Sequence, residues 1–299
     1  METLTRIAEV RAACDAARRD GPRVGLVPTM GAFHAGHRSL MRAARGDGGL
    51  VVVSLFVNPT QFGPHEDLSA YPRDPEGDAA AAEAEGVDIL FSPAVEEMYP
   101  ETPRTTVHVD GLTERLCGAR RPGHFDGVTT VCTKLFAIIG PCAAYFGRKD
   151  AQQLAVVRRM VQDLDLPVDV VGCPLVREAD GLAMSSRNAY LTADERRAAL
   201  VLSRALRRVA DAVRDGVRRA ASLRELLVAT IGRERLVALD YAEIVDAATL
   251  EPVREIDGEV LVAVAAQVGR ARLIDNCTLN VSGQGAVTAD LGVVADPSA

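Results

Sequence analysis

Arg23-Val24-Gly25-Leu26-Val27-Pro28 leads through a short turn into His34-Ala35-Gly36-His37, and this junction decides the fold. The first stretch is an apolar run ended by proline, which predicts a strand. Residues 38–45 have the composition of a helix. The chain therefore passes from a strand into a helix at the two histidines.

The start of this helix has the chemistry of an anion site. Its first amide groups have no partner within the helix, and the positive end of the helix dipole lies there. Gly36 lets the backbone approach a phosphate, and His34 and His37 add hydrogen-bond donors for a transferring phosphoryl group. Two ordinary surface histidines are one alternative. A metal site is another, although no HExxH or CxxC pattern lies nearby.

The first half of the chain alternates between apolar runs and helical segments, which is typical of a doubly wound parallel sheet. An α+β fold with scattered strands is the alternative. Further strands are expected at 50–57, 87–91, 143–146 and 168–172, and helices at 75–85, 125–139 and 150–164.

The pattern changes after about residue 175. Thr192 and Glu195 form a capping box that opens a long helix to about Asp215. A helix at 222–232 follows, and then alternating segments at 239–245, 260–268 and 271–279. The sequence therefore predicts a Rossmann-like α/β domain at 1–175 and a smaller α+β lid domain at 176–299.

Composition narrows the class of protein. The 299 residues are 48% hydrophobic, and the net charge of −7 argues against a nucleic-acid-binding surface. No stretch approaches the ~20 apolar residues of a membrane span, and Met1–Arg6 lacks the pattern of a secretory signal. The six cysteines show no paired spacing, as expected of buried thiols in a reducing cytosol. We expect a cytoplasmic protein without a membrane partner.

A second motif bears on the ligand. Met184-Ser185-Ser186-Arg187 places two hydroxyls and a guanidinium in succession, which suits a polyphosphate. On its own it would be an ordinary serine-rich loop. Together with the His34–His37 turn, it resembles the paired HxGH and KMSKS-type elements of the nucleotidylyltransferase superfamily, whose members bind ATP or CTP and attack its α-phosphate.

Five blocks, in order and spread from about residue 20 to 280, resemble the pantoate–β-alanine ligase family. They are Val27–His37, Phe56–Gly63, Arg121–Val128, Phe146–Gln153 and Val176–Asn188. The resemblance implies an ATP-dependent condensation of pantoate with β-alanine that gives pantothenate, AMP and pyrophosphate through a pantoyl adenylate. It also implies a homodimer.

The resemblance implies a role for particular residues. His37 is the expected proton donor; His34, Lys149, Ser185, Ser186 and Arg187 would stabilise the phosphates. Gln61 and Gln153 would bind pantoate, Gln61 would also meet β-alanine, and Met30 and Phe62 would face the gem-dimethyl group of pantoate. The expected ATP-binding residues are Met30, Gly31, Ala32, Phe33, His34, Ala35, Gly36, His37, Gly147, Arg148, Lys149, Asp150, Val176, Met184, Ser185, Ser186 and Arg187.

Magnesium is expected to accompany the ATP phosphates and to keep most of its waters. Glu76 and Asp78 lie near the family's acidic magnesium-contacting region, but the metal ligands stay unassigned. The chain departs from the family pattern at Arg148, Ala151 and Arg38, where glutamate, an aromatic and an aliphatic residue are usual. Two other functions compete: a nucleotidylyltransferase that leaves the nucleotide on its product, and an ATP-binding regulatory protein.

Overall fold

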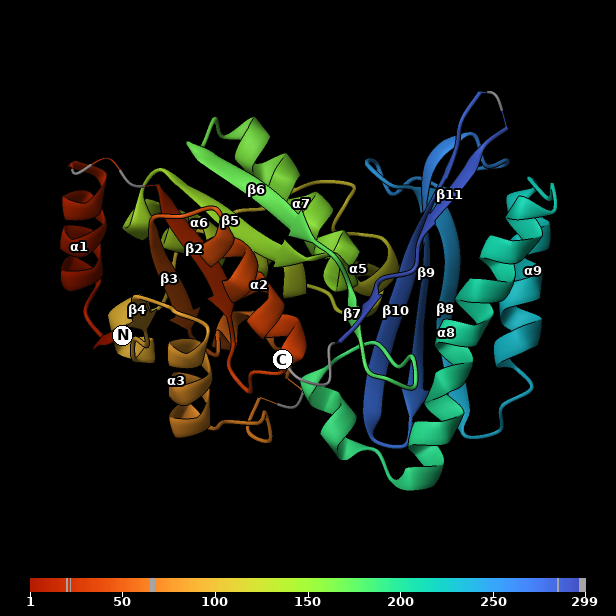
Figure 1. Cartoon of the computed structure of the whole chain (residues 1–299), viewed down its shortest axis with the longest axis horizontal. Helices are drawn as coiled ribbons and strands as arrows, with labels where there is room; N and C mark the ends of the chain where they lie inside the picture. The colour runs from red at the N-terminus through yellow and green to blue at the C-terminus, as the bar shows by residue number, and fades with distance from the viewer. Residues whose placement is uncertain (20, 22, 65–67, 284, 296–299) are drawn as a thin grey trace. The chain divides into compact units, whose positions relative to one another are not determined.

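The computed structural model describes residues 1–19, 21, 23–64, 68–283 and 285–295 (Figure 1). The chain divides into two compact units. The first comprises Met1–Glu114 and Gly118–Cys173, and the second comprises Arg115–Cys117 and Pro174–Ala299. In the described part of the chain, no helix combines the length and the apolar character needed to cross a membrane.

The first unit is built on a six-stranded sheet in the order β1-β4-β3-β2-β5-β6, in which every adjacent pair is parallel. The strand order reverses at β2, because β3 and β4 extend to one side and β5 and β6 to the other. In such sheets, ligands bind at the carboxyl ends of the strands where the order reverses. The strands are β1 (Glu2–Leu4), β2 (Val24–Thr29), β3 (Leu50–Leu55), β4 (Ile89–Phe91), β5 (Cys142–Gly147) and β6 (Val168–Cys173).

Helices cover both faces of this sheet. Leu40, Met41 and Ala44 of α2 pack with Val27 and Val51 of the sheet in a core that also includes α3, and Figure 1 shows α2 and α3 on the same face. Helices α1, α6 and α7 pack together in the other layer. The helices are α1 (Ile7–Arg19), α2 (Ala35–Gly46), α3 (Pro75–Ala84), α4 (Val95–Met98), α6 (His124–Ile139) and α7 (Ala151–Asp163), with single 3₁₀ turns η1 (Pro59–Gln61) and η2 (Arg148–Asp150). Helix α5 (Leu116–Arg120) begins in the second unit and ends in the first.

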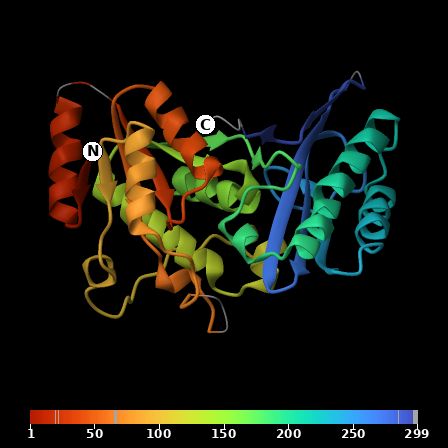
Figure 2. The same ribbon diagram turned by 60° about the horizontal axis from the view of Figure 1, so that its bottom comes forward.

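The second unit packs two helices against an antiparallel sheet in the order β11-β10-β9-β8. Figure 2 shows α8 and α9 side by side along this sheet. A parallel pair, β7 with β12, joins the start of the unit to its end. The elements are β7 (Val176–Arg177), the 3₁₀ helix η3 (Ser186–Tyr190), α8 (Ala193–Arg214), α9 (Ala220–Ile231), β8 (Val237–Asp246), β9 (Gly258–Val268), β10 (Ala271–Val281), β11 (Val287–Asp290) and β12 (Val293–Val294).

The predicted fold class is confirmed: a doubly wound parallel sheet and a separate small antiparallel sheet. The capping box of α8 is also present, with Thr192 and Glu195 each bonded to the other's backbone. Strand β3 ends at Leu55, two residues earlier than expected, because Asn58 caps the turn η1 with its side chain. The short strands β1, β7, β11 and β12 were not predicted.

Candidate active site

The predicted phosphate turn lies where β2 ends and α2 begins. His34 is the cap residue of α2, and its Nδ1 accepts the N–H of Gly36 at 3.1 Å. His37 Nδ1 accepts the N–H of His34 at 3.4 Å and completes a reciprocal capping box. The centroids of the two rings lie 4.2 Å apart. The two histidines therefore close the helix start and stand together at its positive end.

These hydrogen bonds assign the protonation of both rings. A ring nitrogen that accepts a hydrogen bond carries no proton, so in each neutral ring the proton resides on Nε2. The pKa of His37 lies well below its usual value, because burial disfavours the charged ring and the positive charges of His34 and Lys149 oppose it further. At neutral pH, His37 is thus an uncharged ring whose Nε2–H is a hydrogen-bond donor.

A carboxylate from α3 holds the turn that precedes the histidines. Asp78 is 3% exposed, and its two oxygens accept the N–H groups of Ala32 at 2.9 Å and Phe33 at 2.6 Å. Gly31 has a φ of +88° and Ala32 a φ of +53°, in the left-handed region that disfavours side chains. A Cβ on Gly31 would lie 2.8 Å from the Asp78 carboxylate, so this position requires glycine.

The second predicted phosphate-binding group follows β5. Lys149 lies in η2, its side chain is 19% exposed, and its Nζ is 3.6 Å from Asp150 Oδ1. Its charge acts on His37 and lowers the pKa of that ring. Because β2 and β5 are neighbours, their carboxyl ends meet where the strand order reverses. The structure therefore brings the His37 turn and the Lys149 turn together.

Gln61, the predicted pantoate ligand, is oriented by a buried asparagine. Asn58 is 1% exposed, and its Oδ1 accepts from Thr60 N–H at 3.3 Å and from the Tyr99 hydroxyl at 3.1 Å. Asn58 Nδ2 is therefore the donor, and it donates to Gln61 Oε1 at 3.1 Å. Gln61 turns its Nε2 toward the sulfur of Met30, 3.1 Å away. This amide group is a donor, as a carboxylate or hydroxyl of a substrate requires.

The start of α6 supports the backbone of Gln61. His124 Nε2 lies 2.9 Å from the guanidinium of Arg121, which can only donate, so Nδ1–H donates to the Gln61 carbonyl at 2.8 Å. Gly127 lies against the same residue: a Cβ there would be 2.6 Å from the Gln61 nitrogen. The block Arg121–Val128 therefore shapes the backbone under Gln61.

Two consecutive glutamines on α7 have different surroundings. Gln152 is buried, and its Nε2 donates to the carbonyl of Leu112 at 2.8 Å. Gln153, the predicted pantoate ligand, is half-buried, and its side-chain amide forms no hydrogen bond with the described residues. Gln152 is thus committed to the fold, whereas the amide of Gln153 is available to a ligand.

The second predicted phosphate motif lies in the second unit. Val176 is buried in β7, and its carbonyl accepts the Met184 N–H at 2.9 Å. Ser185 caps η3, since its Oγ accepts the Arg187 N–H at 3.3 Å. Residues 184–187 are half-buried. The hydroxyl proton of Ser185 is not needed for this cap and can be donated elsewhere.

A buried arginine anchors this loop at its base. The guanidinium of Arg177 is 2% exposed and pairs with both carboxylate oxygens of Asp275, at 2.8 and 2.9 Å. It also donates to the carbonyls of Gly181, Leu291 and Asn276. These bonds tie the Met184 loop to β10 and to the segment before β12.

Arg38 and Arg148, two departures from the family pattern, each interact with a group outside the predicted phosphate turn. Arg38 Nε donates to Glu85 at 2.6 Å, and the Glu85 side chain is 6% exposed, so an ion pair compensates its charge. Arg148 is exposed, and its Nε donates to the carbonyl of Gly172 at the end of β6.

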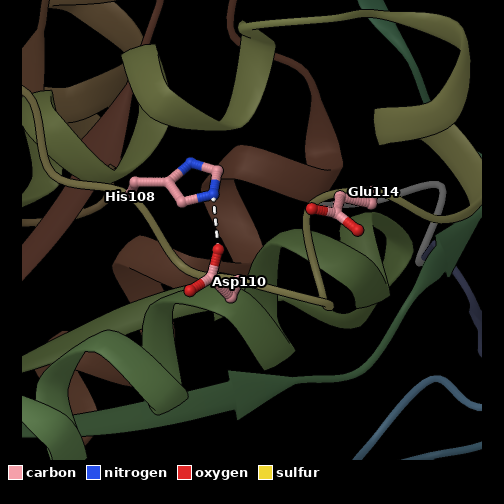
Figure 3. A group of neighbouring side chains, drawn as sticks. All are labelled: His108, Asp110 and Glu114. Carbon is pink, nitrogen blue, oxygen red and sulfur yellow. Dashed lines mark hydrogen bonds and ion pairs between the residues drawn. The ribbon is translucent and has the colours of Figure 1, made fainter.

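One surface cluster in the described part of the chain has side chains that could hold a metal ion. Within the described residues, His108, Asp110 and Glu114 bring three possible ligand atoms within 4.8 Å of one another (Figure 3). All three are exposed, and His108 is paired with Asp126 at 2.6 Å and with Asp110 at 3.1 Å. Asp126 raises the pKa of His108 through this hydrogen bond. The cluster is a solvated ion-pair group, and it includes no residue of the phosphate turn.

Sequence reasoning missed three supporting residues of the first unit. Asn58 and His124 stand within motifs that resemble the family, but only the hydrogen bonds of the structure show that they orient Gln61. Asp78 attracts attention as a possible magnesium contact, yet both of its oxygens hold backbone amides. For Asn58 and Asp78 the signal was a polar residue at a position that the fold buries, whereas His124 is half-buried.

Comparisons with known proteins show which family this chain resembles over its length. The family model for pantoate-beta-alanine ligase matches residues 2–278. A pantothenate synthetase of Koribacter versatilis (strain Ellin345) is 57% identical over 283 residues, which cover 95% of this chain and 97% of that protein. The crystal structure of pantothenate synthetase from Thermus thermophilus matches with a TM-score of 0.88 and 48% identity, over 92% of this chain and 98% of that one.

A third comparison concerns a liganded structure. The pantoate-beta-alanine ligase from Francisella tularensis, complexed with beta-gamma ATP and beta-alanine, matches with a TM-score of 0.71 and 28% identity, over 92% of this chain and 97% of that one. The fold, the site blocks and the match over almost the whole sequence lead to one conclusion: this chain belongs to the pantoate–β-alanine ligase family.

Proposed function

We propose that this chain condenses pantoate with β-alanine in an ATP-dependent reaction that gives pantothenate, AMP and pyrophosphate. Family membership makes it a ligase of pantothenate biosynthesis. The observation that carries the proposal is the pairing of a neutral His37 with Lys149 at the carboxyl ends of β2 and β5. Donors from two separate sequence blocks meet there, as a nucleotide triphosphate requires.

In the first step, a carboxylate oxygen of pantoate attacks the α-phosphorus of ATP, and the bond from that phosphorus to the β-phosphate oxygen breaks. Pyrophosphate leaves, and pantoyl adenylate remains. The Nε2–H of His37 and that of His34 would donate to the phosphate oxygens, and the Lys149 ammonium would balance their charge. Ser185, Ser186 and Arg187 would contact the same phosphates from the second unit.

In the second step, the amine of β-alanine attacks the acyl carbon, and the bond from that carbon to the phosphate oxygen breaks. AMP leaves, and the nitrogen loses a proton. Gln61 would donate to pantoate through Nε2, and it would meet β-alanine when the adenylate is in place. Gln153 would donate to pantoate as well, because its amide is not used by the fold.

The remaining ATP-binding roles are proposals of the same kind. The backbone at residues 30–37 and at Gly147–Asp150 would line the nucleotide, and Val176 would meet the adenine. Magnesium would arrive with ATP and keep most of its waters, because the Asp78 oxygens are occupied by amides. We also propose a homodimer located in the cytoplasm; all six cysteines are buried and none forms a disulfide, which suits a reducing compartment.

One assay tests the function: AMP formation from Mg·ATP and pantoate, with and without β-alanine. We expect continuous AMP release only when all three substrates are present. A nucleotidylyltransferase that keeps the nucleotide on its product would release pyrophosphate without AMP. An ATP-binding regulatory protein would turn over neither substrate. Light scattering of the purified protein tests the dimer.

A further inference from the structure

We propose that Asp78 is a positioning residue that sets the His34–His37 pair by holding the turn before it. The inference deepens the proposed function and rests on it. Asp78 would not touch ATP or pantoate. It would act through two backbone amides, those of Ala32 and Phe33.

The turn before the histidines has a strained backbone. Ala32 carries a side chain at a φ of +53°, an unfavourable conformation that persists only where other contacts enforce it. The Asp78 carboxylate supplies those contacts, since its oxygens accept consecutive N–H groups at 2.9 and 2.6 Å. Gly31 is needed at the same turn, because a Cβ would meet Leu55 at 2.7 Å and Asp78 at 2.8 Å.

The turn is connected to the histidines through Phe33 and the backbone of His34. Phe33, whose amide Asp78 holds, directly precedes His34, and the centroid of its ring lies 5.5 Å from that of His37. The His34 N–H is the group that His37 Nδ1 accepts. A shift of the Phe33 amide therefore moves the donor that fixes the tautomer and orientation of His37.

Burial of the Asp78 carboxylate has an electrostatic cost. Burial raises the pKa of Asp78, and the two amide hydrogen bonds oppose that rise. A nearly fully buried carboxylate is unfavourable unless it has specific partners. Its partners here are backbone amides of the phosphate turn, so the buried charge stabilises the conformation of that turn. A direct magnesium ligand is the competing role, and the experiment separates the two.

The test compares Asp78→Asn with Asp74→Asn on the same helix. The side-chain amide of Asp78→Asn would present an NH₂ group to one backbone N–H, so one of the two hydrogen bonds is lost with almost no change in size. Asp74 caps α3 by accepting Gly77 N–H at 3.0 Å and is well replaced by asparagine as a helix cap. Its charge contributes to the raised pKa of Asp78, but the amides of Ala32 and Phe33 bond to Asp78, so this control removes a nearby charge without removing those hydrogen bonds. We expect kcat of pyrophosphate–ATP exchange to fall about 10–100-fold in Asp78→Asn, with a smaller change in KM for pantoate, and to stay near normal in Asp74→Asn.

A second readout does not depend on activity. In ¹⁵N-resolved spectra of the ligand-free protein, the His37 ring should be the Nε2–H tautomer and titrate well below pH 6.5. In Asp78→Asn we expect mixed tautomers and a midpoint closer to 6.5. A purely structural role would lower the unfolding temperature but leave kcat and the His37 tautomer unchanged. That result would overturn the proposal.

Two further outcomes are decisive. If raising Mg²⁺ restores the activity of Asp78→Asn, the carboxylate is a metal ligand and the proposal is wrong. If Asp78→Asn does not fold, Asp78→Glu keeps the charge and displaces the turn by one methylene; a folded Asp78→Glu with normal kcat and normal His37 spectra would also refute it. Absence of turnover in the unaltered enzyme would instead refute the proposed function, while the spectra would still test the role of Asp78.

Discussion

His37, the proposed hydrogen-bond donor to the ATP phosphates, need not carry a charge for that role. Its Nδ1 is occupied by the His34 amide, so Nε2 keeps its proton without the ring becoming an imidazolium. Burial lowers the pKa of this ring, and the charges of His34 and Lys149 lower it further, so the ring is neutral. A neutral imidazole can strengthen its hydrogen bond as charge grows on a transferring phosphoryl group, and in the proposed site Lys149 would supply the net charge.

The first prediction concerns the titration of two histidines in the ligand-free protein. His37 should titrate well below pH 6.5, and His108 above it, because Asp126 favours the charged form of His108. As pH falls, His37 is protonated at a higher pH in the unfolded chain than in the folded protein. This residue therefore lowers the free energy of unfolding below about pH 6.5. The contribution of His108 has the opposite sign: it is present below pH 6.5 and is lost as pH rises through its raised pKa.

Proton NMR of the ring Hε1 signals measures both midpoints, and the chain has five histidines to assign. Lys149→Gln should raise the midpoint of His37 and leave that of His108 unchanged. A midpoint of His37 at or above 6.5 would contradict the assignment of a neutral donor.

A second prediction at this scale concerns Gln153→Ala. The side-chain amide of Gln153 forms no hydrogen bond with the residues that the structure describes, so its loss should affect ligand binding and leave the unfolding temperature almost unchanged. A hydrogen bond to a charged group contributes about 1.5–3 kcal/mol, so pantoate binding should weaken about 10–100-fold with little effect on ATP. Separate calorimetric titrations of the two substrates measure this. The matched control is the exposed Gln162→Ala on the same helix, and equal losses for ATP and pantoate would mean that Gln153 is misassigned.

At the scale of elements, the long periodic segments could be predicted from sequence and the short ones could not. Strands such as β3 and helices such as α8 carry their own apolar period and caps. Strand β1 has three residues and exists because it pairs with β4, more than 80 residues away. Strand β12 has two residues and pairs with β7. Such elements depend on partners that no local pattern reveals.

The same distinction applies to the site. The motif residues His37, Lys149 and Gln61 could be named from the sequence, because they stand in blocks with family resemblance. Their support could not be predicted. Asp78 holds amides 45 and 46 positions away, and His124 holds a carbonyl 63 positions away. These contacts follow from the packing of α3 and α6, which a sequence pattern does not specify.

The close packing of α6 on η1 gives the third prediction. A Cβ at Gly127 would lie 2.5–2.6 Å from backbone atoms of Thr60 and Gln61, which cannot yield without moving the turn. Gly127→Ala should therefore raise KM for pantoate at least as much as Gln153→Ala does, although alanine favours the helix by about 1 kcal/mol. Gly46→Ala is the control, since a Cβ at this helical position would meet no described atom within 4 Å. A normal KM in Gly127→Ala would show that Gln61 tolerates displacement of η1.

At the scale of the whole molecule, the proposed ATP contacts are divided between the two units. The first unit carries His34, His37 and Lys149, and the second carries Ser185, Ser186 and Arg187. The loop with the serines is tied to its own unit by Arg177, whose guanidinium bonds Gly181 as well as Asp275. These hydrogen bonds hold the base of the loop to its own unit.

This division leads to the last prediction, on the order of the reaction. An acyl adenylate is readily hydrolysed, so water must be excluded until the amine arrives. If the Met184–Arg187 loop contributes to that exclusion, adenylate should form and stay bound with ATP and pantoate alone. Exchange of labelled pyrophosphate into ATP should then require pantoate but not β-alanine. Replacing Ser185 and Ser186 together with alanine should slow the exchange, whereas Ser222→Ala, at an exposed position of α9, should not. Exchange that depends on β-alanine would mean that the amine binds before the first chemical step, and the two-step order proposed for this chain would be wrong.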